Sequence, residues 1–234
     1  MPPTHLPARF LLICLGLTAL AATACEGRKS PHEAQSASSS SCPDEPRWGA
    51  FSSLPELQLD GGGPDIDILK ANFSFLDKTG KTWTARAGLG WDGASIPRVC
   101  WSLIGAPKNG CHRLASIVHD EYYKRREAHQ ESRQAVDEMF YQACRAKGVG
   151  RAKAGVMYYA LRWFGQSWDS ADVSPSSMAL GEQLTLLRRL ELELERGESS
   201  GVASLAAALD EDGELDALDQ LPPPEQLAAL LPER

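Results

Sequence analysis

The sequence predicts an α+β fold: a β-hairpin and a glycine-rich corner, then a helical core with an antiparallel two-helix hairpin, plus a C-terminal helix. Three observations lead to this prediction. Polar and apolar residues alternate in two short runs before residue 88, as in strands with one buried face. Apolar residues then recur every three or four positions between residues 114 and 164, which is the helical period. Glycines separate these segments and mark where each one ends.

The strands are expected within residues 66–88. Asn72–Phe75 and Thr82–Ala85 both alternate, and Asp77–Gly80 between them has the composition of a turn. The three segments together predict a β-hairpin.

A glycine-rich corner follows at Gly88–Pro97. Ser95 precedes Ile96 and Pro97, and this order is typical of a helix N-cap with proline in the first turn. We therefore expect a short helix to about Leu103, and we interpret Ser95 as a cap rather than a nucleophile.

Three longer helices are expected after this corner. The first covers Leu114–Arg125, and the second begins after a capping residue, Ser132. The third, Ala152–Phe164, is apolar almost all round, as in a helix buried within a core. Gly148 and Gly165 mark the ends of the second and third helices.

The C-terminal part has two different compositions. Residues 171–197 contain a helix with a leucine stripe over Leu180–Leu194, which packs either on the domain or on an unknown partner helix. Residues 198–234 carry a net charge of −8, whereas the whole chain carries −7, so the rest of the chain is close to neutral. We expect a mobile acidic tail at residues 198–234. The remainder is close to neutral with no basic stripe, which argues against a nucleic-acid partner.

The N-terminus resembles a bacterial lipoprotein signal over residues 1–24. The apolar run Phe10–Ala22 is too short to span a bilayer but has the length of a signal-peptide core. Small residues precede Cys25, as in a lipobox, so Cys25 is expected to carry the lipid. The alternative is an ordinary secretory signal cut near Ala24, which would leave Cys25 as a thiol.

The segment 25–47 is rich in serine and proline, so it predicts a flexible tether between the lipid anchor and a main domain at 48–170. Glu26, directly after the lipidated cysteine, favours the outer membrane. The expected location is therefore the bacterial cell envelope, with the membrane as a partner through the lipid.

Four further cysteines suit an oxidising compartment and predict two disulfides. If the first two long helices form an antiparallel hairpin that turns near Gln130, Cys111 and Cys144 lie at nearly the same level. We therefore predict a Cys111–Cys144 disulfide, which leaves Cys42 to pair with Cys100.

The same hairpin geometry brings His119 within side-chain reach of Asp137. A histidine held by a carboxylate through one ring nitrogen presents the other nitrogen as a general base. Asp120 points elsewhere and can hold a cation. Calcium prefers oxygen ligands, which Asp92 and the carbonyls of Gly90 and Gly93 in the glycine-rich corner can supply.

Several motifs resemble a phage-associated family of domains of unknown function, over about residues 66–166. The family pattern is roughly T-D-G-A-S-I-P-R, H-D-x-x-Y, A-D-x-x-F and a closing aromatic-Arg-x-x-G helix. This chain has tryptophan for the first threonine and valine for the alanine. The matching segments are Trp91–Arg98, His119–Tyr123, Val136–Phe140 and Tyr158–Gly165.

A weaker resemblance is to secretory phospholipase A2. It implies that His119 is the base, Asp120 the calcium ligand, Tyr123 a supporting hydroxyl and Asp137 the residue that orients His119. The chain lacks the C-C-x-x-H-D run of those enzymes, and Asp92 stands where their calcium loop mostly uses carbonyls.

Two classes of function follow from these patterns. The first is a calcium-assisted hydrolase similar to phospholipase A2, with a phospholipid ester as substrate and His119 as base. The second is a non-catalytic phage-derived or envelope module in which His119, Asp120 and Asp137 form a buried structural network.

Overall fold

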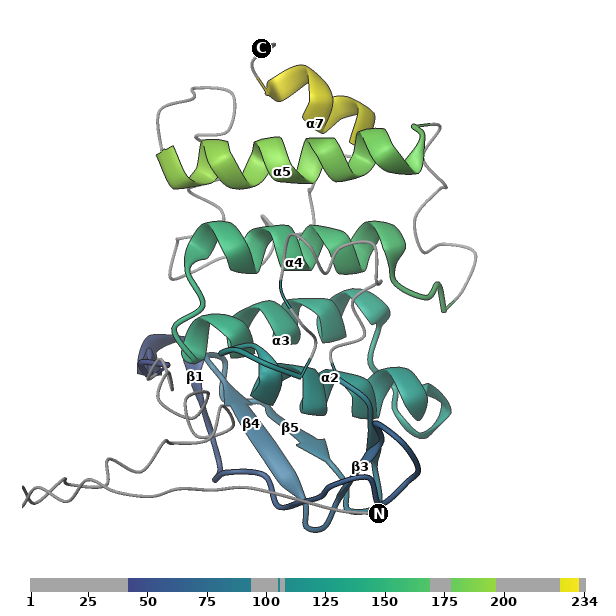
Figure 1. Ribbon diagram of the computed structural model, residues 1–234. Coiled ribbons are helices and arrows are strands. Elements are labelled where there is room, and N and C mark those ends of the chain that lie inside the picture. Colours follow the sequence, from purple (N-terminus) through teal and green to yellow (C-terminus); the bar gives the residue numbers. More distant parts are fainter. Residues whose placement is uncertain (1–41, 94–104, 106–107, 169–177, 197–223, 232–234) are drawn as a thin grey trace, which may run out of the picture. The chain divides into compact units, whose positions relative to one another are not determined.

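The computed structural model describes residues 42–93, 105, 108–168, 178–196 and 224–231, and it confirms an α+β fold (Figure 1). The first part of the chain forms two small antiparallel sheets, with strand orders β1-β4-β5 and β2-β3-β6. The elements of this part are η1 (Pro46–Trp48), β1 (Gly49–Phe51), β2 (Leu57–Gln58), β3 (Asp67–Leu69), β4 (Phe73–Asp77), β5 (Thr82–Ala85) and β6 (Gly90–Trp91). The helices are α2 (Arg113–Lys124), η3 (Arg126–Ala128), α3 (Arg133–Ala146), α4 (Arg151–Phe164), α5 (Leu180–Arg196) and α7 (Pro224–Leu230).

The predicted hairpin is confirmed, and its turn is organised by Asp77. The Asp77 carboxylate accepts hydrogen bonds from the backbone N–H groups of Thr79 and Lys81, at 2.9 and 3.0 Å, and from the Trp83 indole at 2.8 Å. Gly80 has φ = 88°, a left-handed conformation that glycine adopts without steric cost. Burial would by itself raise the pKa of Asp77, but these donors outweigh it and hold that pKa below 3.8.

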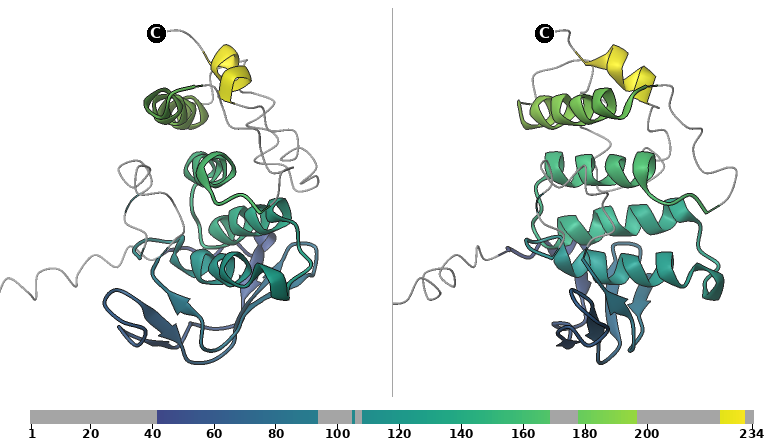
Figure 2. Two further views of the ribbon diagram at one scale, coloured as in Figure 1. Left: turned by 90° about the vertical axis from the view of Figure 1, so that its right-hand side faces the viewer. Right: turned by 45° about the vertical axis from the view of Figure 1, so that its right-hand side comes forward.

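The helices follow one another as layers above the β1-β4-β5 sheet (Figures 1 and 2). α2 packs on β4 and β5, α3 packs on α2, and α4 packs on α3. The predicted cap is confirmed, because the Ser132 hydroxyl accepts from the backbone N–H of Ala135 at 3.1 Å. Gly148 ends the second helix with φ = 70°, and the middle of α4 is buried as its composition predicts. The short helix expected from Ser95 lies outside the described residues.

The leucine-striped helix packs within this same chain. α5 lies on α4 with Leu187 and Leu190 fully buried, and α7 lies on α5 through Leu227. The expectation of a mobile tail is therefore wrong for residues 224–231, where apolar residues at helical spacing find a buried surface. The rest of the acidic segment lies outside the described residues.

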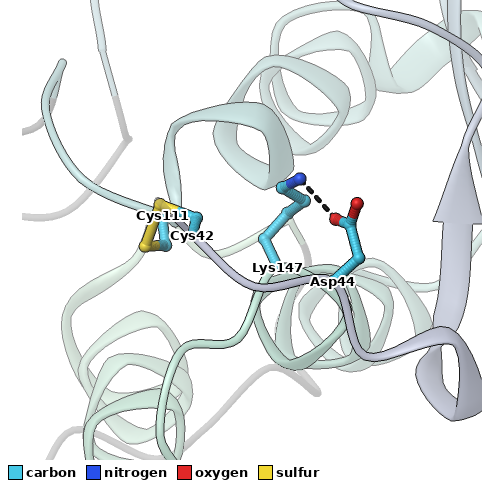
Figure 3. The surroundings of a disulfide bond; sticks show 4 residues. All are labelled: Cys42, Asp44, Cys111 and Lys147. Atoms are coloured by element: carbon cyan, nitrogen blue, oxygen red, sulfur yellow. Dashed lines mark hydrogen bonds and ion pairs between the residues drawn. A yellow bond between two sulfur atoms is a disulfide. The ribbon is translucent and has the colours of Figure 1, made fainter. Parts of the chain in front are cut away.

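The predicted disulfide pairing is wrong. Cys42 bonds to Cys111, with 5.5 Å between their Cα atoms (Figure 3). Cys144 is a free thiol on α3 whose side chain points into the core, where burial raises its pKa well above the usual value. Two residues at the same height along neighbouring helices need not face each other, which is why the Cys111–Cys144 prediction failed. Cys100 lies outside the described residues, and its predicted partner Cys42 is already bonded.

The last residues of the expected tether are part of the folded domain. Asp44 forms an ion pair with Lys147 beside the disulfide (Figure 3). Pro43 packs on Gly148, where an added Cβ would lie only 2.5 Å from the Pro43 carbonyl oxygen. The boundary expected at residue 48 therefore comes earlier, because the Cys42 disulfide and these contacts hold the chain from residue 42 onward.

Asp77→Asn is expected to lower the free energy of unfolding by about 1–3 kcal/mol at pH 7, because the charged acceptor of several buried donors is lost. A carboxylate with a depressed folded-state pKa contributes stability above its unfolded pKa and loses it as the pH falls through the folded value. The difference between wild type and variant should therefore shrink below about pH 4. Urea unfolding at pH 7 and pH 3 measures it, and an equal difference at both pH values would contradict this account.

Candidate functional site

The centre of the candidate site is a buried hydrogen bond between α2 and α3. His119 Nε2 lies 3.0 Å from Asp137 Oδ1, and the two side chains are 1% and 0% exposed. The antiparallel packing of the two helices, which η3 and the Ser132 cap help to fix, brings these residues to the same level. The structure thus brings together His119 and Asp137, the pair that the antiparallel hairpin predicted.

Asp137 has further partners on three helices. The Tyr123 hydroxyl donates to Asp137 Oδ1 at 2.7 Å, and Arg162 Nη1 lies 3.1 Å from Oδ2. Arg133 Nε approaches Oδ2 at 3.8 Å. Burial alone would lower the pKa of the Arg162 guanidinium, but the negative charge of Asp137 outweighs this effect and raises that pKa. The negative charge of Asp137 is therefore compensated inside the protein.

Arg133 connects this network to the end of α4. Its Nη2 donates to the carbonyl oxygens of Leu161 and Arg162 at 2.7 and 3.0 Å, and its Nε donates to the Tyr123 hydroxyl at 3.2 Å. The last carbonyls of a helix have no partner within the helix, and a cation is favourable there. Arg133 is 3% exposed and fixes α4 against α2 and α3.

Hydrogen bonds to Asp137 and Arg133, and ring stacking on His119, fix the position of Tyr123. Its ring lies on His119 with 4.2 Å between ring centroids. Burial and the charge of Asp137 raise the pKa of the Tyr123 phenol, which therefore stays protonated and acts as a donor. Arg133, Tyr123 and Asp137 thus form a directed chain of hydrogen bonds that ends at the carboxylate holding His119.

Three of the four predicted calcium ligands also come together, around the ammonium of Lys124. Lys124 Nζ lies 2.9 Å from Asp120 Oδ2, 2.6 Å from Asp92 Oδ1 and 2.9 Å from the carbonyl oxygen of Gly90. We call these three oxygens the cation cradle. Within the described residues, Gly93 does not contribute an oxygen to the cradle; it adopts a left-handed backbone conformation with φ = 112°.

The cation cradle has one fixed side and one accessible side. The Asp120 side chain is fully buried, whereas those of Lys124 and Asp92 are 40% and 61% exposed. Burial would lower the pKa of Lys124, but Asp120 and Asp92 outweigh it and raise that pKa. Burial would likewise raise the pKa of Asp92, and the Lys124 hydrogen bond reverses this and lowers it.

The cradle fits a hard cation by its chemistry. A positive group already lies within hydrogen-bonding distance of all three oxygens, and two of the donors are carboxylates. Calcium takes oxygen ligands of these kinds and completes its shell with further carbonyls or water. Among the described residues, no group of three or more His, Cys, Asp or Glu side chains is placed to hold a metal, so a cation here depends on the Gly90 carbonyl as well.

Sequence reasoning missed the basic residues of the site. Arg162 is the arginine of the closing Arg-x-x-G motif, but the motif alone does not indicate that this side chain pairs with Asp137. Arg133 and Lys124 each stand four residues from a site carboxylate on the same helix, and this spacing was an available signal. Cys25 lies outside the described residues. No helix in the described ranges combines the length and apolar character needed to cross a membrane.

Comparison with known proteins finds a family model that matches the stretch containing His119, Asp137 and the cation cradle. Residues 68–161 match a family model described as "Protein of unknown function (DUF1353)". The matched stretch runs from β3 to α4 and lies within the range that the motifs predicted. It supports a domain-of-unknown-function family for this region.

Two curated relatives from Sinorhizobium fredii are both named as uncharacterized proteins, y4jT and y4iH. The first is 40% identical over 124 residues, which cover 52% of this chain and 35% of the relative. The second is 32% identical over 107 residues, covering 46% of this chain and 44% of the relative. The chain thus spans less than half the length of either relative. No solved structure matches it.

Two buried tyrosines provide a matched test of the network. Tyr123→Phe should lower the free energy of unfolding by about 1.5–3 kcal/mol, because its hydroxyl donates to a charged carboxylate. Tyr159→Phe should be neutral or stabilising, because the Tyr159 hydroxyl is buried with no hydrogen-bond partner among the described residues. Urea unfolding of both variants decides this, and equal losses would show that the Asp137 bond contributes nothing specific.

Proposed function

We propose that the α2–α3 pair carries a hydrolase site in which His119 activates a water molecule for attack on an ester, with phospholipid as the substrate class. One observation carries the proposal. His119 is held by the buried carboxylate of Asp137, and the next residue on the same helix is Asp120. Asp120 binds the Lys124 ammonium together with the oxygens of Asp92 and Gly90 in the glycine-rich corner. A general base beside a cation-binding group is the arrangement that assisted ester hydrolysis requires.

The residues would divide the work as follows. Asp137 can only accept a hydrogen bond, so His119 Nε2 carries the proton and Nδ1 presents a lone pair. Nδ1 takes a proton from water as the water oxygen bonds to the ester carbonyl carbon. The same nitrogen returns the proton to the alcohol oxygen as the ester bond breaks. Tyr123 and Arg162 hold Asp137 in place throughout.

Calcium is the cofactor that we propose for the cradle. Asp120, Asp92 and the Gly90 carbonyl would hold the ion, which would polarise the ester carbonyl when bound. The fixed position of Asp120, one residue after His119, keeps the cradle and the base in a constant relation.

A second proposal, a non-catalytic phage-derived or envelope module, has its own support. His119 is 1% exposed, and the charge of Asp137 is already balanced by Arg162. A polar network that is satisfied and closed to water contributes to a unique packing without any chemistry. Under this proposal His119 connects two helices and meets no substrate.

For either proposal we infer an envelope location, with the chain anchored by lipid on Cys25. The signal-like run before Cys25 supports the anchor. The Cys42–Cys111 disulfide supports an oxidising compartment on independent grounds, because such bonds are rare in the cytosol. The serine-rich composition between Cys25 and Cys42 is typical of a tether, which would give an anchored domain reach along the membrane surface.

The hydrolase proposal predicts fatty-acid release from phospholipid vesicles by the full chain in the presence of calcium. His119→Gln should reduce the rate at least about 100-fold, because the general base is removed. His129→Gln is the matched control, since His129 lies outside the network, and it should retain the rate. Wild type that releases no fatty acid, combined with an unfolding free energy lowered by His119→Gln, would instead support the non-catalytic module.

The anchor is tested separately from the site. Cells that express the full chain with labelled palmitate should incorporate label into it, and Cys25→Ser should abolish the labelling because no thiol remains to start the modification. Cys42→Ser is the control for a general effect of losing a cysteine. Equal labelling of wild type and Cys25→Ser would contradict lipid attachment at Cys25, and absence of label from the wild type would favour an ordinary secretory signal.

A further inference from the structure

The side chain of Lys124 occupies the position that a metal ion would need. Its ammonium contacts all three oxygens of the cation cradle at 2.6–2.9 Å. Calcium–oxygen distances in proteins are about 2.3–2.6 Å, so the same oxygens could hold the ion only where the ammonium now lies. The two cations therefore exclude each other.

We propose that Lys124 is an internal competitor for this cradle: it holds the site without metal, and a divalent cation binds only by displacing it. This inference rests on the cradle of the proposed hydrolase and adds the way in which that site is regulated.

The geometry permits the exchange. Lys124 is the last residue of α2, and its side chain is 40% exposed, so the ammonium can turn into solvent without moving the core. Asp120 stays in place because it is fully buried, while Asp92 is 61% exposed and can adjust to a new ligand. The long lysine stem keeps the ammonium close enough to return when the cation leaves.

The charges explain why one cation is always needed. Asp120 is a buried carboxylate, and an uncompensated buried charge is strongly unfavourable. Lys124 supplies one positive charge against the two carboxylates, and a divalent cation supplies two. An ion and an ammonium held by the same oxygens would repel each other over a few ångströms. The cradle thus alternates between two compensated states, and the one with lysine is closed to catalysis.

This competition restrains an enzyme that is anchored beside its own substrate. A phospholipid hydrolase tethered to a membrane meets esters continuously. A competing lysine weakens cation binding, so that the site is loaded only where the free cation concentration is high.

Calcium titration of the full chain by calorimetry tests the competition directly, with Lys124→Met as the key variant. Methionine keeps the length and the helix propensity of lysine without its charge. Lys124→Met should bind calcium about tenfold or more tightly than wild type, in the range usual for two coupled ligands. Calcium should also raise the melting temperature of Lys124→Met more than that of wild type, because Asp120 regains a partner.

Lys108→Met is the matched control. Lys108 is a half-buried lysine whose charge reaches Asp92, but its ammonium pairs with Asp67 at 3.2 Å instead of entering the cradle. Lys108→Met should bind calcium with an affinity no more than slightly above that of wild type. An equal gain in both variants would overturn the proposal, since the effect would then be one of net charge. Adding Asp120→Asn to Lys124→Met should remove the gain, and retention of it would place the ion elsewhere.

The outcomes separate this inference from the proposed function. Tighter calcium binding by Lys124→Met without ester hydrolysis by any form supports the competition and refutes the hydrolase. Ester hydrolysis with no calcium binding to Lys124→Met refutes the competition and leaves a metal-independent base. Absence of both overturns both proposals.

Discussion

The buried carboxylate of Asp137 is the group on which the arrangement of the helical core depends. Burying a carboxylate away from water costs roughly several kcal/mol unless positive charges and hydrogen-bond donors replace the solvent. Three helices supply the replacements: α2 through His119 and Tyr123, α3 through Arg133, and α4 through Arg162. The helices can meet around this group only in an arrangement that brings all these partners to it. Compensating this single charge therefore constrains how the three helices pack.

The three residues His119, Asp120 and Glu121 follow one another on α2, and all are buried. Successive residues of a helix point about 100° apart, so each faces a different neighbour. His119 contacts Asp137 on α3, and Asp120 pairs with Lys124, which also contacts Asp92 after β6. Glu121 pairs with Arg86, which follows β5, at 2.6 Å. Each side chain that a functional interpretation would select thus also ties α2 to a separate part of the domain. Function and packing cannot be divided residue by residue in this motif.

Local signals predicted most of the fold and half of the site. The alternation around Asp77, the Ser132 cap and the helical period depend on neighbouring residues, so the sequence contains them directly. The His119–Asp137 pair also followed, because a short helical hairpin fixes levels by simple counting. The Cys42–Cys111 bond did not, because it joins residues 69 positions apart and requires knowing that the expected tether docks on the domain.

The basic residues were missed for a related reason. A carboxylate has a recognisable role in a motif, whereas its compensating cation can come from any element that packs nearby. Arg162 reaches Asp137 from a helix 25 residues further along the chain, so its role depends on tertiary structure. Lys124 is only four residues from Asp120, but the sequence gives no reason to expect that the same ammonium also reaches Asp92 and Gly90.

The position of the family match adds a further constraint. The matched residues 68–161 include His119, Asp137 and Lys124, whereas α5, α7 and the Cys25 region lie outside it. Arg162 is the first residue beyond the match, and α5 covers the outer side of the helix that carries it. The cradle and all of the Asp137 network except Arg162 therefore lie in the matched stretch, and the anchor proposed at Cys25 lies outside it. On this division the matched stretch holds the groups on which any chemistry of the site would depend, whereas the anchor proposed at Cys25 would affect only which molecules reach them.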